Sequence, residues 1–272
     1  MTTAQLKWVW SCMHCETQRD HAAMWAALLT GWFFLLRASE YVGPVKTRGG
    51  DPSAPETGGA SRFQVNPCDP SEERVAPRGR AEKSTDGAHL GYGHRSQPCQ
   101  EKGLRGCDLQ AFADGKPVAS FAEADEVRLC IRGSKVDQLN QGHVMNHFRT
   151  QNAELCVVGA LELYQRHAPD RFGKNQTGAV FTWASGKQVT RACLQQVLVR
   201  SAEALGLPPD RMASHSLRFG GATAIWAAYK DSALVKRWGR WASDAFHGYL
   251  WEDKDNARGV AEAMAKTSIA LM

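Results

Sequence analysis

The chain has 272 residues, of which 43% are hydrophobic and 22% are charged. A chain of this length and composition can bury a complete hydrophobic core, which excludes a wholly disordered protein and allows one large domain or two small ones. The formal net charge of +5 suits a polyanionic partner, but many proteins that bind none carry a similar excess. The charge alone therefore does not identify the function.

The start of the chain shows no secretory signal, and its eight cysteines are unremarkable for this length. We therefore expect reduced thiols and an intracellular location, which would be the nucleus in a eukaryote. The longest apolar run, residues 22–36, is interrupted by Thr30 and Gly31. Because it falls short of the roughly 20 residues of a bilayer span, we expect a buried helix and no membrane association.

Residues 20–41 predict a core helix, because apolar residues and good helix formers continue as far as a polar end that holds Arg37. Over residues 44–106 the composition changes to Gly, Pro, Ser and charged residues, with almost no periodic apolar positions. We interpret this second segment as a disordered insertion of low complexity.

A small antiparallel sheet of about three strands is expected next. Residues 107–113 and 126–132 predict two strands that pair as a hairpin, and residues 142–148 could add a third. Lys135 would then lie on a polar loop between two strands.

Helices dominate the second half of the chain. Apolar residues recur at helical spacing in residues 155–167, 190–205, 216–229 and 232–238. A last helix is expected within residues 253–272, and its apolar face could pack against its own domain or against a neighbouring protomer. The fold class is therefore mixed α+β and mainly helical.

The tract that ends at Tyr249 carries residues suited to cleaving a phosphodiester without a metal ion. His215 and Arg218 are three residues apart at the start of an expected helix, so both side chains can reach one phosphate. The Tyr249 phenol is a nucleophile once nearby cations or a base promote its ionisation. Lys135 is a natural general acid for the leaving 5′ oxygen. Taken singly these signals are weak, since His-x-x-Arg arises by chance and a lysine in a turn is usually a solvated charge.

Taken together and in order, these residues resemble the catalytic domain of the tyrosine recombinase (phage integrase) family. The set comprises Arg37, Lys135, His215, Arg218, Gly239 followed by Arg240 and Trp241, and Tyr249. In the details of residues 134–138, 215–223 and 239–246 the chain is most similar to recombinases of DIRS and Crypton retroelements. The resemblance implies one integrase-type catalytic domain over residues 1–272 that carries the insertion. The family usually has a separate N-terminal DNA-binding domain, and we expect it to be absent here because only about twenty residues precede the first expected core helix.

The family also implies a role for each residue. Arg37 and Arg218 would hold the scissile phosphate, and His215 would act as an acid/base or phosphate donor. Lys135 would protonate the leaving oxygen. Tyr249 would form the 3′-phosphotyrosine link.

One position departs from the family pattern. The family has His or Trp directly after the glycine, nine residues before the tyrosine, and this chain has Arg240 there, with Trp241 one residue later. Either residue could donate a hydrogen bond to the phosphate. We favour Trp241, because an indole N–H resembles the family's role, while Arg240 keeps the spacing.

The function implied is the cleavage and rejoining of DNA strands in site-specific recombination or integration. The partners implied are double-stranded DNA and three further protomers in a tetramer, and the chemistry needs neither a cofactor nor a metal ion. Two alternatives stay open. The chain could be a catalytically inactive DNA-binding relic, or it could relax a single duplex as type IB topoisomerases do.

Other constellations give weaker signals. Cys12-x-x-Cys15 with His14 suggests zinc, but no second pair follows at finger spacing, so we interpret these as packing or surface thiols. His143 and His147 share one face of an expected strand without a nearby carboxylate, and we interpret them as polar edge residues.

Overall fold

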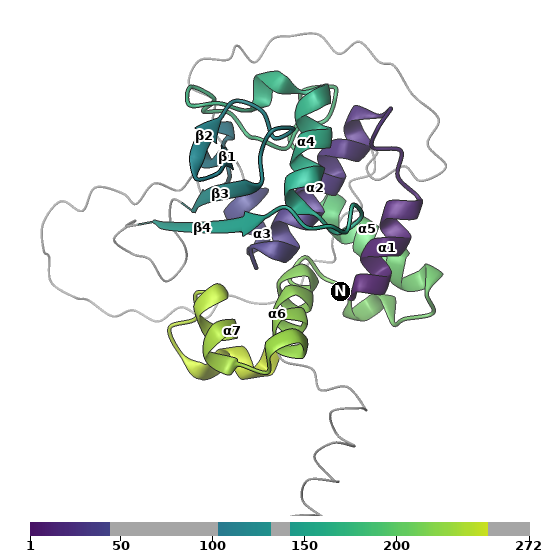
Figure 1. The fold of residues 1–272 in the computed structure, drawn as a ribbon. Coiled ribbons are helices and arrows are strands. Elements are labelled where there is room, and N and C mark those ends of the chain that lie inside the picture. The colour runs from purple at the N-terminus through teal and green to yellow at the C-terminus, as the bar shows by residue number, and fades with distance from the viewer. Residues whose placement is uncertain (44–102, 132–141, 250–272) are drawn as a thin grey trace, which may run out of the picture.

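The structure, a computed structural model, describes residues 1–43, 103–131 and 142–249 (Figure 1). The α-helices are α1 (Thr3–Ser11), α2 (Arg19–Phe33), α3 (Ala38–Tyr41), α4 (Val157–His167), α5 (Arg191–Ala204), α6 (Ser216–Tyr229) and α7 (Ser232–Trp238). The strands are β1 (Leu109–Ala113), β2 (Lys116–Val118), β3 (Glu126–Ile131) and β4 (His143–Phe148). Short 3-10 turns are η1 (Gly106–Asp108), η2 (Pro169–Arg171), η3 (Pro209–Arg211) and η4 (Asp244–Tyr249).

Helix α2 forms the centre of the hydrophobic core. Its residues from His21 to Trp32 are all buried, as expected for a helix that is apolar around its whole circumference. It packs against α4 on one side and α6 on another, while α1 packs on α5. Figure 1 shows the sheet beside α2 and α4, with α6 and α7 in the lower part of the view.

The helix expected over residues 20–41 is interrupted, which corrects the prediction. Helix α2 ends at Phe33, and Leu35 adopts a left-handed conformation with φ of 50°. The N–H of Leu36 then donates to the oxygen of Gly31 at 3.0 Å, as in a Schellman helix end. Because glycine normally occupies the left-handed position, the sequence carried no signal for this break. Arg37 therefore caps the N-terminus of a separate short helix, α3.

The sheet is antiparallel with strand order β2-β1-β3-β4. The expected pairing of the first two strands is confirmed, with Ala111 opposite Val127, and β4 adds the third strand beside β3. A fourth strand, β2, was not predicted. It forms because Asp114 and Gly115, with φ of 49° and 73°, make a tight turn that returns the chain directly alongside β1.

The predicted insertion lies mostly outside the described residues, which resume at Gly103. The last residues assigned to it nevertheless belong to the fold, because Leu104 is buried and its carbonyl accepts a hydrogen bond from the N–H of Val180 at 3.1 Å. The helix expected within residues 253–272 also lies outside the described part of the chain.

The helices predicted for the second half are confirmed as α4, α5, α6 and α7. Helix α1 was missed, although its capping box, in which the Thr2 and Gln5 side chains bond each other's backbone N–H, follows a recognisable sequence pattern. Gln5 anchors α1 by donating to the Ser201 hydroxyl of α5 at 3.2 Å. None of the described helices is long and apolar enough to cross a membrane.

Candidate active site

The end of α2 is the point at which distant segments of the chain meet. Three consecutive carbonyls there each accept a hydrogen bond from a side chain of a different segment. The pairs are His147 Nε2 with Phe33 O at 2.8 Å, Arg240 Nη1 with Phe34 O at 3.1 Å, and Arg218 Nη1 with Leu35 O at 2.6 Å. The last carbonyls of a helix lack partners within it and carry partial negative charge, so these three donors, two of them the cations Arg218 and Arg240, stabilise this end.

Arg218 joins the end of α2 to the end of α7. Its Nη2 donates to the carbonyl of Gly239 at 2.5 Å, while its Nη1 holds Leu35. Its guanidinium carbon lies 4.4 Å from the centre of the Trp241 ring, and the side chain has no exposed area. The predicted phosphate-binding arginine is thus buried beneath an indole.

Arg37 lies at the more exposed edge of the same region. Its Nη1 is 2.8 Å from Glu40 Oε1, and 22% of its side chain is exposed. The other carboxylate oxygen, Glu40 Oε2, accepts from Arg240 Nη2 at 2.9 Å. Sequence analysis missed Glu40, and no capping signature marks it, because the N-cap residue of α3 is Arg37 rather than Ser, Thr, Asp or Asn.

His215 is half-buried at the N-terminal boundary of α6. Burial lowers the pKa of its imidazole below 6.5, and the positive charges of Arg218, Arg37 and Arg191 lower it further, against a smaller opposite effect of Glu40. Because the charges of both arginines affect this pKa, the predicted residues Arg37, His215 and Arg218 lie in one neighbourhood. At neutral pH the imidazole is uncharged and can accept a proton.

The two residues considered for the His/Trp position point in different directions. Arg240 has a left-handed backbone with φ of 56°, and its guanidinium turns inward to Glu40 and to the end of α2. Trp241 lies over Arg218 instead. Gly239 has to be glycine here, because an added Cβ would come within 1.5 Å of the Trp241 ring. The assignment of Trp241 as a phosphate donor stays a prediction.

The predicted nucleophile belongs to the last turn that the structure describes. Tyr249 ends η4, and its side chain is not among the described atoms. Phe246 of the same turn is buried in a cluster with Leu35, Ala222 and Val235. The backbone of this turn is thereby attached to α6 and to the break after α2.

Lys135 lies outside the described residues. The strands on either side of it are described, and Ile131 at the end of β3 pairs with His143 at the start of β4. Burial lowers the pKa of His143, and the positive charge of Arg240 lowers it further. The start of β4 at His143 therefore lies within electrostatic reach of Arg240.

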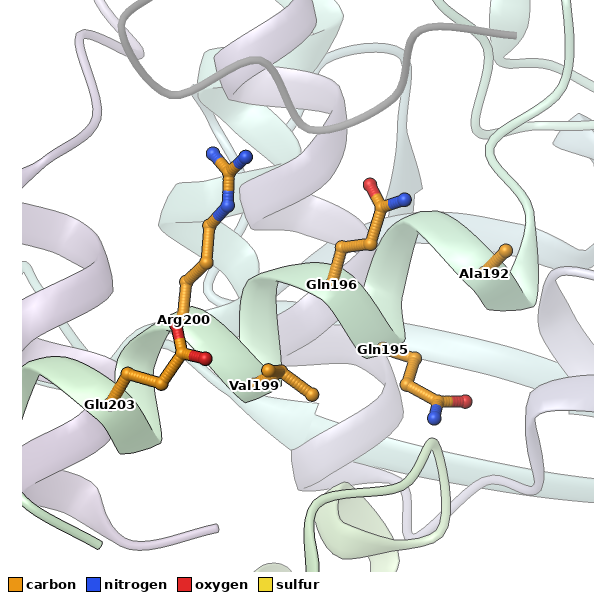
Figure 2. A pocket seen from close by; sticks show the side chains of 6 residues that line it. All are labelled: Ala192, Gln195, Gln196, Val199, Arg200 and Glu203. Atoms are coloured by element: carbon orange, nitrogen blue, oxygen red, sulfur yellow. The ribbon is translucent and has the colours of Figure 1, made fainter. Parts of the chain in front are cut away.

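Helix α5 carries several polar side chains around a depression in the surface (Figure 2). Among the described residues, a surface depression is lined by Ala192, Gln195, Gln196, Val199, Arg200 and Glu203. Figure 2 shows Gln196 and Arg200 extending to the same side of the helix. The positive charge of Arg191, at the start of α5, lowers the pKa of His215, so this end of the helix lies within electrostatic reach of the candidate site.

The Cys12-x-x-Cys15 pair and the histidines of β4 were the remaining candidates. Cys15 is buried, which raises the pKa of its thiol to about 12, and the described residues contain no group of three His, Cys, Asp or Glu that could hold a metal ion. The interpretation of His147 as a polar edge residue is corrected. Although β4 is an edge strand, the His147 ring packs against Phe34 and Trp238, with ring centroids 4.6 and 5.6 Å away.

Comparison with known proteins identifies the fold. No protein-family model and no curated protein matches the chain. The structure is similar to that of the XerH site-specific recombinase bound to its difH substrate in a pre-cleavage complex, with a TM-score of 0.50 and 13% identity. The match covers 97% of this chain and 54% of XerH, so the chain spans about half the length of that recombinase. The mainly helical fold with its small antiparallel sheet is that of a tyrosine recombinase catalytic domain.

Proposed function

We propose that this chain cleaves and rejoins DNA strands through a covalent 3′-phosphotyrosine link to Tyr249. The observation that carries the proposal is the meeting of Arg37, His215 and Arg218 around the end of α2. These residues come from separate segments of the chain, and the charges of both arginines reach His215. Fixed cations beside a neutral imidazole provide what phosphodiester cleavage requires.

In the proposed reaction Arg37 and Arg218 bind the scissile phosphate. His215 takes the phenol proton of Tyr249 as the phenol oxygen forms its bond to phosphorus, and the bond from phosphorus to the 5′ oxygen breaks. Lys135 gives the departing 5′ oxygen a proton. Rejoining reverses these transfers, and the phosphotyrosine bond conserves the energy of the phosphodiester.

The burial of Arg218 sets a condition on this reaction. A guanidinium with no exposed area cannot meet a phosphate, so the cover that includes Trp241 has to move before the substrate binds. Once moved, the indole N–H of Trp241 would be free to serve as a phosphate donor, as the resemblance implies. The described arrangement is accordingly a closed form of the proposed site.

We further propose double-stranded DNA as the partner. Gln and Arg are among the side chains that contact base edges and phosphates, and α5 carries Gln195, Gln196 and Arg200 around one surface depression. XerH, which shares the fold, was solved with its difH substrate. Assembly of four protomers and descent from a DIRS or Crypton element remain part of the proposal.

The decisive experiment traps the covalent intermediate. Supercoiled plasmid is incubated with the protein, the reaction is stopped with denaturing detergent, and DNA-linked protein is measured. We expect an adduct with the wild type that Tyr249→Phe abolishes. Tyr229→Phe is the matched control, because this tyrosine on α6 is 69% exposed and lies outside the proposed site. An adduct that persists in Tyr249→Phe would mean that another residue is the nucleophile.

The closed state of Arg218 favours one alternative, a DNA-binding protein that breaks no bond. This alternative predicts salt-dependent binding of duplex DNA, no adduct, and identical behaviour of the wild type and Tyr249→Phe. If the adduct does form, a plasmid with two target sites distinguishes recombination from relaxation of a single duplex.

A further inference from the structure

Glu40 is shared by two arginines that come from distant parts of the chain. Its Oε1 lies 2.8 Å from Arg37 Nη1, and its Oε2 lies 2.9 Å from Arg240 Nη2. The exposed fractions of the side chains order the three groups, with Glu40 at 1%, Arg240 at 11% and Arg37 at 22%. Glu40 and Arg240 thus form a buried ion pair, and Arg37 is its outer neighbour.

The number of arginines around Glu40 decides whether Arg37 keeps a net positive charge. A buried carboxylate that paired with Arg37 alone would cancel its charge and compete with any phosphate for its N–H groups. Two guanidinium groups around one carboxylate leave a net positive charge instead. Since Arg240 is the more buried arginine, the excess charge lies at Arg37, toward solvent.

Arg240 is held in place independently of Arg37. Its Nη1 donates to Phe34 O at 3.1 Å and lies 3.0 Å from Met145 Sδ of β4. Its backbone adopts a left-handed conformation with φ of 56°, and the neighbouring Trp241 ring lies over Arg218 instead. The Arg240 guanidinium is therefore oriented toward the protein interior, where Glu40 lies.

We propose that Arg240 is a positioning residue that pairs with Glu40 on its buried side, so that Arg37 keeps both its charge and its orientation for a phosphate. Arg240 itself does not touch the substrate. The inference rests on the proposed function, since it assigns Arg37 the role of binding the scissile phosphate. It also explains how this chain accommodates an arginine directly after Gly239.

The test compares Arg240→Met, Arg240→Lys and the double variant Glu40→Gln with Arg240→Met. Single-turnover adduct formation is measured over a range of DNA concentrations, and melting temperatures monitor folding. Arg240→Met should lower the rate at saturating DNA about 10- to 100-fold, because Arg37 is then displaced toward Glu40 and misplaces the phosphate. Arg240→Lys should stay within about threefold of wild type, because an ammonium still neutralises Glu40.

The double variant distinguishes positioning from direct contact. A neutral glutamine cannot cancel the charge of Arg37, so adding Glu40→Gln should restore most of the rate lost in Arg240→Met. If Arg240 donated to the phosphate itself, Glu40→Gln would restore nothing and Arg240→Lys would lose activity nearly as far as Arg240→Met. Either result would overturn the inference. If Arg240→Met fails to fold, the rate of Arg240→Lys decides.

A second readout does not depend on catalysis. In ¹⁵N-labelled protein the Nε–H resonance of Arg37, identified by its loss in Arg37→Lys, should move in Arg240→Met and stay near its original position in Arg240→Lys. If the wild type forms no adduct but this pattern is seen, the proposed function fails and the positioning of Arg37 by Arg240 stands. An unmoved resonance in a folded Arg240→Met protein would refute the positioning role.

Discussion

The Trp241 ring covers the guanidinium of Arg218, with the guanidinium carbon 4.4 Å from the ring centre. An indole face attracts a cation, and the attraction is stronger where water is excluded, as it is around this fully buried side chain. The same contact keeps the proposed phosphate-binding group from solvent. In the proposed reaction Trp241 would therefore have two roles, because it covers Arg218 in the described arrangement and its N–H would donate to the phosphate once this cover moves.

Substitution of Trp241 can separate these roles. Trp241→Phe should preserve most of the packing, and with it the free energy of unfolding to within about 1 kcal/mol. Without an indole N–H it should still lose adduct formation by roughly 10²- to 10³-fold. Trp241→His should recover part of that activity, because an imidazole can donate. Trp226→Phe, at a partly buried position on α6, is the control. Equal activity of Trp241→Phe and the wild type would remove Trp241 from the proposed site residues.

Arg218→Lys is expected to damage both fold and activity. A lysine cannot reach Leu35 O and Gly239 O together, and each buried carbonyl left without a donor costs about 1–3 kcal/mol. A point charge also cannot replace the planar fork of arginine at a phosphate. Chemical denaturation should show the loss of stability, and the adduct assay the loss of activity. Arg211→Lys, at an exposed position in η3, should change neither.

The sequence predicted well those features that depend on periodicity. The limits of α6 and α7 agree with the spacing of their apolar residues, and the alternation in β3 placed its buried face correctly. The break at Leu35 was missed because a left-handed leucine has no sequence signal and is held by tertiary contacts, among them the bond from Arg218 to its carbonyl. Local patterns do not contain such contacts.

In the candidate site, too, sequence patterns predicted some features and missed those that depend on tertiary contacts. The family pattern selected Arg37, His215 and Arg218, and the structure brings them into one neighbourhood. The family pattern could not indicate that Glu40 joins Arg37 to Arg240, because that network depends on the folding of two segments some 200 residues apart in the chain. The left-handed backbone conformation of Arg240 also had no signal in the sequence and is evident only from the structure.

The activity should depend on pH through His215. Its pKa lies below 6.5, chiefly because of burial and then because of the surrounding arginines. A base has to be neutral to accept the phenol proton, so the rate should fall only when the pH drops below the pKa of His215. Arg191→Gln removes one of the charges that lower the pKa, so it should raise the pKa and move the fall in rate to higher pH. Adduct formation measured from pH 5 to pH 8 tests this, and a fall in rate that does not shift in Arg191→Gln argues against His215 as the base.

The stability of the fold should decrease in acid through His147. Burial lowers the pKa of this histidine to about 4, whereas an unfolded histidine titrates near 6.5. Between these values the unfolded state binds more protons, so the free energy of unfolding declines as the pH falls from 6.5 to 4, by about 3 kcal/mol in total. His147→Gln keeps an N–H for Phe33 O but does not titrate, and should flatten this dependence. His247→Gln, at an exposed position, controls for the substitution itself.

Helix α6 packs closely on α2 at Gly221, and alanine substitutions at Gly221 and at a control glycine, Gly159, test this contact. A Cβ on Gly221 would come within 2.2 Å of Trp32 O, so Gly221→Ala should push α6 away from α2 and lower the free energy of unfolding by about 1–3 kcal/mol. A Cβ on Gly159 in α4 would meet its nearest neighbour at an ordinary 3.5 Å, so Gly159→Ala should be neutral or stabilise by up to about 1 kcal/mol. Because α6 carries Arg218, with His215 at its start, Gly221→Ala should also reduce adduct formation at temperatures where the protein remains folded. Equal stability of the two variants would contradict the packing of α6 on α2 on which the candidate site depends.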